Sequence, residues 1–211
     1  KGYTIDGCVH WLVGSAPGTD FHTFWRELGV FPGTRVIDPD CFARFAGRDG
    51  RSFELFTDAN RLEAHLLELS PADAPLAREL CDRVRQFSRF SPPMGRAFET
   101  MGFLGLLGML ARTGRYLKPM SAMAGLTIGS WARGWHDPLL QQAWPQVLQN
   151  PRYSLQALVL TLADVHRRSA GFPSGGSLAL ARRIESRLLS LGGTIRYKAP
   201  VEEILTEGGR A

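Results

Sequence analysis

The clearest hydrophobic pattern in this chain is a stripe of apolar residues that follows Pro173 and Ser174. Its members recur at steps of three or four, as on one face of a helix, and they are Leu178, Ala181, Ile184, Leu188 and Leu191. Ser174 is predicted to cap this helix at its N-terminus. Gly192-Gly193 is predicted to end it, because glycine adopts the left-handed C-terminal conformation without a steric penalty.

Helical spacing also runs through the middle of the chain, where about five helices are expected between residues 57 and 170. Asp58 or Thr57 is predicted to cap the first of them. Ser70-Pro71-Ala72-Asp73 combines a serine cap, a proline at the first helical position and an acidic residue three positions on. Two later helices are predicted to begin at Asp137-Pro138 and at Ser154.

The most apolar helical candidate runs from Ala97 to Arg112, and a further segment follows from Lys118 to Ala132. Glycines recur at every third position, at Gly102, Gly105 and Gly108. This spacing is not the G-x-G-x-x-G fingerprint of dinucleotide-binding proteins, and no strand precedes it. Since a helical glycine costs about 1 kcal/mol relative to alanine, we expect these glycines to serve either core packing or the lining of a cavity.

Short apolar runs between turn residues predict strands at both ends of the chain. In the first of them, Tyr3, Ile5 and Val9 are the strand-forming positions and Asp6-Gly7 is a turn or bulge. Asp49-Gly50 is predicted to be a hairpin turn. The predicted strands are Gly2–Val13, Val36-Ile37, Phe42–Phe45, Phe53–Phe56, Thr194–Tyr197 and Val201–Thr206. Together with the helices, they predict an α+β fold, mostly helical, with a small antiparallel sheet.

The charge and cysteine content narrow the class of protein. The 211 residues carry a formal charge of +5 that is dispersed along the chain, so nucleic acid is not expected as a partner, while attraction to an anionic membrane stays open. Cys8, Cys41 and Cys81 form no C-x-x-C pair, which argues against a disulfide framework and a zinc site. We expect a reducing, cytoplasmic location. No run of about 20 apolar residues predicts a spanning helix.

Reactive side chains do not point to acid–base or nucleophilic catalysis. No two of the five histidines have the spacing that places two ligands on one helix face, and no metal is expected. Asp164, His166 and Ser169 lie too close in sequence for a triad of the usual kind, and no G-x-S-x-G elbow is present. No catalytic residue is therefore assigned.

Two stretches resemble a known family. Pro173-x-Gly175-Gly176-x-x-x-Leu180, followed by Gly192-Gly193-Thr194-Ile195 and Val201-x-x-Ile204, resembles the segment with which phytoene desaturase-like flavoproteins of the amine oxidase superfamily return to their FAD domain. The N-terminal stretch from Gly2 to Gly29, with Gly-Tyr-Thr-Ile-Asp-Gly-Cys-Val-His-Trp at its start, is similar to the passage after the Gly-rich flavin-binding segment in bacterial phytoene dehydrogenase-related proteins. The family has glycine where this chain has Cys8.

The resemblance implies an FAD-dependent oxidoreductase that acts on a hydrophobic, carotenoid- or isoprenoid-like substrate by hydride transfer to or from the flavin. It implies a strand-rich segment at 1–56, a helical substrate-binding block at 57–170 and a helix–strand return into the split FAD-binding domain at 171–211. The residues implied to contact the cofactor are Val201, Gly175, Gly176 and Asp6. Those implied to contact substrate are His10, Trp11, Phe103, Leu106, Met109 and Met123.

These residues also have plainer interpretations. Asp6 would serve as a turn former, His10 as a polar contact at a strand end and Gly175-Gly176 as an ordinary helix start. The chain opens at Lys1 without a methionine and closes at Arg210-Ala211 just after a strand signal, so we expect it to be an excerpt that needs the remainder of its parent chain. Because the G-x-G-x-x-G unit is absent, we expect that the chain neither retains FAD nor turns over alone. The alternative is a non-enzymatic lipid-binding or membrane-associating helical module.

Overall fold

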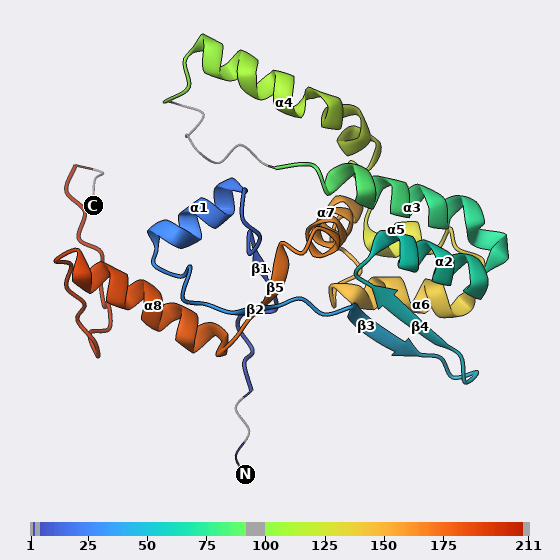
Figure 1. Ribbon diagram of the computed structural model, residues 1–211, viewed down its shortest axis with the longest axis horizontal. Helices are drawn as coiled ribbons and strands as arrows, with labels where there is room; N and C mark the ends of the chain where they lie inside the picture. Colours follow the sequence, from blue (N-terminus) through green and yellow to red (C-terminus); the bar gives the residue numbers. More distant parts are fainter. Residues whose placement is uncertain (1, 3–4, 92–99, 209–211) are drawn as a thin grey trace.

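The computed structural model describes residues 2, 5–91 and 100–208, and this part of the chain contains eight α-helices and two small antiparallel sheets (Figure 1). The helices are α1 (Asp20–Glu27), α2 (Ala59–Leu69), α3 (Ala74–Phe87), α4 (Phe103–Ala122), α5 (Ile128–Ala132), α6 (Pro138–Val147), α7 (Leu155–His166) and α8 (Gly176–Ser190). The strands are β1 (Leu12–Val13), β2 (Val36–Ile37), β3 (Cys41–Ala46), β4 (Ser52–Phe56) and β5 (Ala170–Pro173). The α+β class is thus confirmed.

The three-stranded sheet joins the N-terminal segment to the segment that follows α7. Its order is β1-β5-β2, and both outer strands run antiparallel to β5. Leu12 lies opposite Gly171, and Val36 lies opposite Pro173. Gly171 is required there because a Cβ atom would lie 2.4 Å from Val36 Cγ1. Figure 1 shows α1 and α8 on one side of this sheet and the helical block on the other.

The second sheet is the predicted hairpin, in which β3 pairs with β4. Asp49 and Gly50 form the turn, and Gly50 has a φ of 82° that suits glycine. The rings of Phe45 and Phe53 stack with centroids 5.9 Å apart. Phe53 and Leu55 are fully buried, so the hairpin packs on the helical block rather than on the three-stranded sheet.

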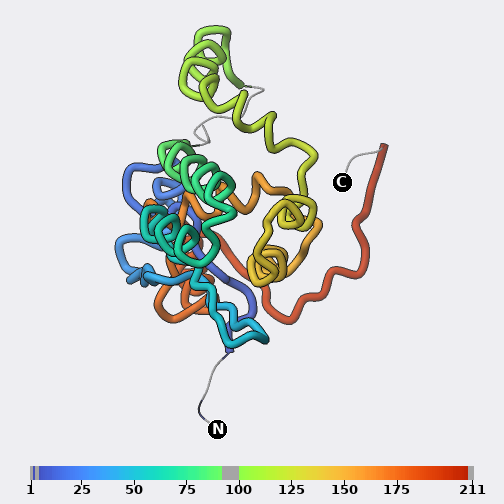
Figure 2. Tube along the Cα trace, turned by 90° about the vertical axis from the view of Figure 1, so that its right-hand side faces the viewer, coloured from blue at the N-terminus to red at the C-terminus, as the bar shows by residue number. Residues whose placement is uncertain are grey.

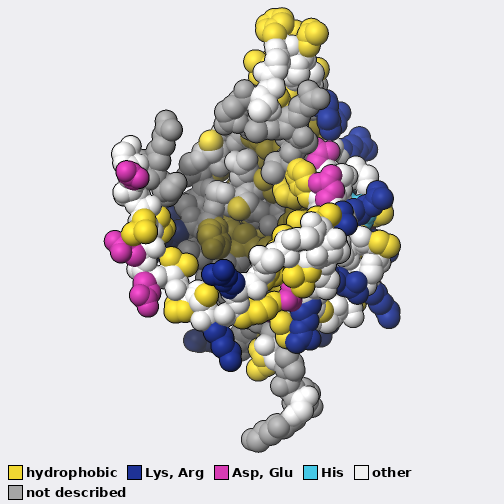
Figure 3. All heavy atoms as spheres, turned by 90° about the vertical axis from the view of Figure 1, so that its left-hand side faces the viewer, with side chains coloured by type: hydrophobic (Ala, Val, Ile, Leu, Met, Phe, Trp, Pro, Cys, Tyr) yellow, Lys and Arg dark blue, Asp and Glu magenta, His cyan; other side chains and the backbone are white. Residues whose placement is uncertain are grey.

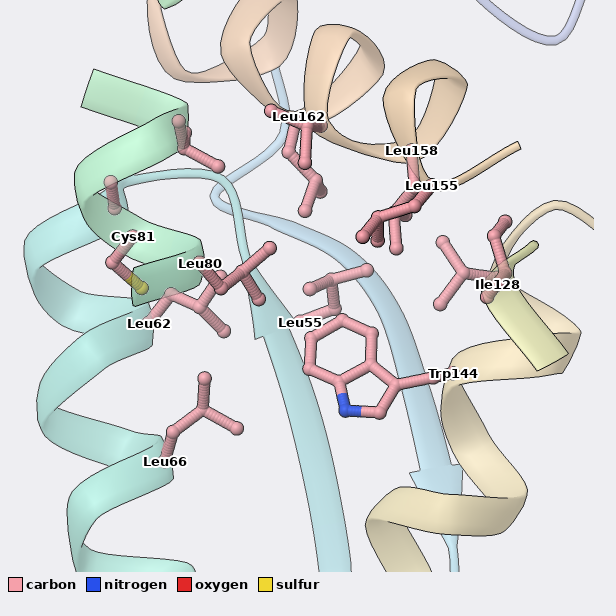
Figure 4. Packing of buried hydrophobic residues seen from close by; sticks show 14 of the residues in the cluster. Leu55, Leu62, Leu66, Leu80, Cys81, Ile128, Trp144, Leu155, Leu158 and Leu162 are labelled. Atoms are coloured by element: carbon pink, nitrogen blue, oxygen red, sulfur yellow. The ribbon is translucent and has the colours of Figure 1, made fainter. Parts of the chain in front are cut away.

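One continuous hydrophobic core lies between the hairpin and helices α2, α3, α5, α6 and α7. Figure 4 shows Trp144 at its centre, with Leu55 from the hairpin on one side and Leu158 from α7 on another. The Trp144 ring lies 5.3 Å from that of Trp131 and 5.5 Å from that of Trp135, centroid to centroid. Burying these side chains is the main favourable contribution to the stability of the block.

The ends of several helices are as the sequence predicts. Asp58 caps α2, Asp137 caps α6 and Ser154 caps α7, each by accepting hydrogen bonds from backbone N–H groups of the first turn. Gly192 follows α8 in the left-handed conformation with a φ of 84°. Gly29 follows α1 in the same way.

Ser70 does not form the predicted cap. Its hydroxyl donates to the Asp73 carboxylate at 2.7 Å instead of accepting from the helix, and Pro71–Asp73 forms a 3-10 turn before α3. Asp73 is buried and also accepts from the backbone N–H groups of His136 and Asp137. The acidic residue therefore links the start of α3 to the start of α6.

Several predictions near the chain ends are wrong. The N-cap of α8 is Gly175, not Ser174, because Pro173 still pairs with Val36 in the sheet and the chain turns one residue later. Residues 194–197 and 201–206 form no strand, since no neighbouring strand pairs with them among the described residues. The first predicted strand is reduced to Leu12–Val13; Ile5 is exposed, and Tyr3 lies outside the described residues.

Helix α4 begins later and ends later than predicted. It runs from Phe103 through Pro119 to Ala122, and the predicted start at Ala97 lies outside the described residues. Figure 2 shows this helix projecting from the body. Tyr116 is its one buried residue and packs against Phe87 and Phe90 of α3 and the turn after it. Nothing in the described part of the chain is both long and apolar enough to cross a membrane as a helix.

Candidate functional site

His10 and Trp11 lie together in a surface groove of about 580 Å³. They enter it from the residues before β1, and the opposite wall comes from the end of α6, the α6–α7 turn and α7. The groove is lined by His10, Trp11, Val147, Leu148, Gln149, Asn150, Tyr153, Ala157 and Thr161. Two of the predicted substrate-contacting residues thus share one groove.

The turn between α6 and α7 is held in place by α5 and the residues before it. The backbone N–H groups of Ile128 and Gly129 donate to the carbonyls of Tyr153 and Pro151, at 2.8 and 2.9 Å. Gln149 adopts a left-handed φ of 58°, which lets the chain reverse direction directly after α6. The groove wall at Gln149 and Tyr153 is therefore a fixed surface.

Trp11 is positioned by aromatic contacts on its own side of the groove. Its ring meets Phe42 of β3 edge-on, with centroids 5.4 Å apart, and lies 5.9 Å from the His10 ring. The groove as a whole combines the apolar faces of Trp11 and Tyr153 with the amides of Gln149 and Asn150. This lining suits an apolar molecule that carries a small polar group.

The groove offers binding rather than acid–base chemistry. His10 is its one ionisable side chain other than the Tyr153 phenol, and no carboxylate lines it. No group of three or more metal-ligating side chains occurs in the described ranges. Cys81 is buried, and burial raises the pKa of its thiol to about 12, so it is not a nucleophile.

Asp6, Gly175 and Gly176 also come together, at the N-terminus of α8. Asp6 accepts hydrogen bonds from the backbone N–H of Ser177 and, at 2.9 Å, from its hydroxyl. Together with the Cys8 N–H, these bonds lower the pKa of Asp6 to about 2, and the Ser177 backbone contributes most. A Cβ on Gly176 would lie 2.4 Å from the Asp6 carboxylate. This carboxylate therefore occupies the place where a helix N-terminus would receive an anion.

Val201 lies apart from this corner. It is exposed and belongs to no strand. Among the described residues, three of the four predicted cofactor contacts therefore lie together, namely Asp6, Gly175 and Gly176. The Asp6 carboxylate itself occupies the space at the helix N-terminus. These residues do not form a cradle for FAD by themselves.

The remaining predicted substrate contacts fall into two other places. Phe103, Leu106 and Met109 lie on α4, where the first two are exposed and Met109 is half-buried. Met123, just after α4, is buried and borders a smaller cavity of about 170 Å³ between α3, α5 and α7. The predicted substrate contacts therefore do not line one continuous tunnel within the described residues.

The glycines of α4 fulfil neither of the two expectations for them. Gly102 and Gly108 have open space where a Cβ would lie, and Gly105 would contact only Met101, at 3.6 Å. They neither permit close packing nor line a cavity in the described structure.

Sequence reasoning missed Gln149, Tyr153 and Thr161. An aromatic residue two positions after the helix-ending Asn150-Pro151 is a signal that could have indicated Tyr153. The left-handed conformation of Gln149 has no sequence signal, because glutamine rarely adopts it. Comparisons of the chain with protein-family models, with curated proteins and with solved structures find no match in any of the three.

Proposed function

We propose that this chain is the substrate-holding part of an FAD-dependent oxidoreductase of the phytoene desaturase-like kind, with a hydrophobic, carotenoid-, isoprenoid- or lipid-like substrate. The proposal rests on the two stretches that resemble this family. It assigns the His10–Trp11 groove to the substrate. Within the described residues there is no complete FAD cradle, so the remainder of a parent chain has to supply the flavin contacts and the redox chemistry.

The observation that carries the proposal is the meeting of the two family-like stretches in space. Strand β5, which leads into the second stretch, pairs with β1 inside the first. Asp6 bonds to Ser177, and Arg187 of α8 donates to the Glu27 carbonyl at 3.1 Å. A helical block inserted between two sequence segments that fold together is the arrangement expected of a split cofactor domain with a substrate domain inside it.

The groove supports the substrate assignment by its chemistry. An apolar chain could contact the Trp11 and Tyr153 faces, and a terminal polar group could bond to Gln149 or Asn150. The groove lining contains no carboxylate, and His10 is its one basic side chain. The role of the lining residues is therefore to bind and orient the substrate. They also exclude water from an apolar ligand.

The direct test is an absorption spectrum of the full-length parent protein, purified without added cofactor. The flavin bands in the near-ultraviolet and blue are expected, and they should shift on anaerobic addition of a reductant. A colourless parent protein that also fails to take up added FAD would overturn the proposal.

The second candidate is a non-enzymatic lipid-binding module, and the exposed apolar residues of α4 favour it. The sequence of the parent gene distinguishes the enzyme from the lipid-binding module. A βαβ unit with G-x-G-x-x-G encoded upstream supports the enzyme, whereas a parent without such a unit supports the module.

A further inference from the structure

The apolar face of α4 points away from the body of the protein. Phe103, Leu106, Leu107 and Leu110 are spaced by three and four residues, so they share one face, and all four are exposed. Tyr116, the buried residue of this helix, falls on the opposite face by the same helical geometry. Figure 3 shows hydrophobic side chains gathered at the tip of the projection that α4 forms.

The charges of α4 are all of one sign. Phe103–Ala111 carries no charge, and the three charged residues that follow are Arg112, Arg115 and Lys118, all exposed. No aspartate or glutamate occurs between residues 100 and 136. The helix therefore combines an uncharged first half with a cationic second half.

We propose that α4 lies on an anionic lipid surface, with Phe103, Leu106, Leu107 and Leu110 in the acyl–headgroup boundary. Apolar faces that carry Phe and Leu beside Lys and Arg are typical of helices that lie in this interface. The long stem of Lys118 lets its charged end reach the lipid phosphates, whereas the Arg115 guanidinium bonds to the Tyr116 hydroxyl at 2.7 Å. The helix rests on the bilayer without crossing it.

Charge complementarity selects this occupant over a second copy of the chain. If two copies of α4 paired, Arg112, Arg115 and Lys118 would find no acidic residue on the partner helix. An anionic bilayer supplies both the apolar layer and the negative charges. The inference rests on α4 alone and does not need the flavin, so the flavin spectrum and the lipid experiment can fail independently.

The experiment is co-sedimentation of the 211-residue chain with vesicles of phosphatidylcholine and with an equal mixture of phosphatidylcholine and phosphatidylserine. We expect binding to the mixed vesicles, weaker binding to phosphatidylcholine and a loss of affinity as salt is added. The variant L106Q/L107Q/L110Q should bind both vesicles at least about tenfold more weakly. The variant K118Q should lose roughly fivefold on mixed vesicles only.

The matched control is L178Q/L189Q, which removes exposed leucines from α8 and should leave vesicle binding unchanged. Circular dichroism must show that every variant is folded. Folded wild-type protein that ignores the mixed vesicles would overturn the proposal, as would equal binding by L106Q/L107Q/L110Q. A dimer in light scattering that disappears in this variant, without vesicle binding, would assign the face to a second copy instead.

Discussion

Asp6 and Ser177 are 171 positions apart in the sequence, yet the carboxylate of one accepts two hydrogen bonds from the other. This contact ties the N-terminal segment to the first turn of α8. A carboxylate at this place also complements the partial positive charge of the helix N-terminus. The pair is one of the side-chain contacts that join the N-terminal segment to α8, beside the bond from Arg187 to the Glu27 carbonyl.

We expect D6N to loosen this junction without unfolding the helical block. The pKa of Asp6 is lowered to about 2, so the carboxylate remains ionised, and its contribution to stability is present, above the unfolded value of ~3.9. That contribution is lost as the pH falls through about 2. Amide exchange at Ser177 should therefore be faster in D6N at neutral pH, and a nuclear magnetic resonance titration of the wild type should show its Ser177 amide shift near pH 2.

The control for this junction is E202Q, an exposed carboxylate outside the α8 N-terminus. It should leave the exchange rate at Ser177 unchanged. Unaltered Ser177 exchange in D6N would show that the contact does not hold α8 in solution.

Replacing Asp73 by alanine should cost about 2–4 kcal/mol of unfolding free energy, because it leaves the buried Ser70 hydroxyl and the partly buried N–H groups of His136 and Asp137 without their acceptor. Burial by itself acts to raise the pKa of Asp73, but hydrogen bonds from His136, Ser70 and Asp137 outweigh it and hold the pKa below its usual value. The stabilisation is thus present above about pH 4 and is lost on acidification through the folded pKa. Urea unfolding across this range measures both effects.

Asp82 provides the comparison for D73A, since its side chain is 73% exposed and forms only a surface ion pair with Arg85. D82A should cost no more than about 0.5 kcal/mol. Equal losses in the two variants would contradict the linking role of Asp73.

Two glycine substitutions should have opposite effects. G108A places a methyl group in open space on α4 and should stabilise that helix by about 1 kcal/mol. G171A places one 2.4 Å from Val36 Cγ1 and should destabilise the protein by about 1–3 kcal/mol. Thermal unfolding measures the stability of both variants, and amide exchange within α4 measures the local effect of G108A. Destabilisation by G108A would mean that this face of α4 is covered in solution.

If the groove holds the substrate, removing an aromatic side chain from its lining should weaken ligand binding. W11A removes an aromatic face from the lining and should weaken the binding of a C20 isoprenoid alcohol by roughly tenfold, about 1.4 kcal/mol. Y197A removes an exposed aromatic side chain outside the groove and should leave the affinity unchanged. Isothermal calorimetry with the alcohol in detergent measures both, and equal affinities for W11A and the wild type would remove the groove from the substrate assignment.

The cysteines should react in a defined order. Cys8 is exposed and should be alkylated by iodoacetamide in the native protein. Cys81 is buried, with its pKa raised to about 12, and should react only after unfolding. Mass spectrometry of peptides from native and urea-treated protein reads out both sites. Rapid native labelling of Cys81 would show that the core opens readily.

Local signals predicted those elements whose stabilising contacts are local. Asp58, Asp137 and Ser154 cap their helices by bonds to the next turn, and the Asp49-Gly50 turn needs only its own two strands. The wrong predictions concern residues whose conformation depends on pairing with a segment far away in the sequence. Ser174 loses the cap position because Pro173 pairs with Val36. Residues 201–206 have the composition of a strand but no partner among the described residues.

The candidate site shows the same division. His10 and Trp11 were singled out by their motif, and the structure places them in one groove. Gln149 and Tyr153 face them only because α5 fixes the α6–α7 turn through Ile128. No sequence pattern near His10 or near the α6–α7 turn predicts that these two segments lie together, because their contact depends on the packing of the whole helical block.

The position of β5 also sets an order of events during synthesis. β1 and β2 leave the ribosome early, but their shared neighbour lies at Ala170–Pro173. Their edges therefore stay unpaired while more than a hundred residues of the helical block are translated. The helices before α7 can begin to pack before β5 appears, but the core is completed only by α7 and by Ala170 of β5 itself. The N-terminal strands therefore gain their neighbour at the stage at which the core closes. Chaperone protection during translation would be needed most at residues 12–37.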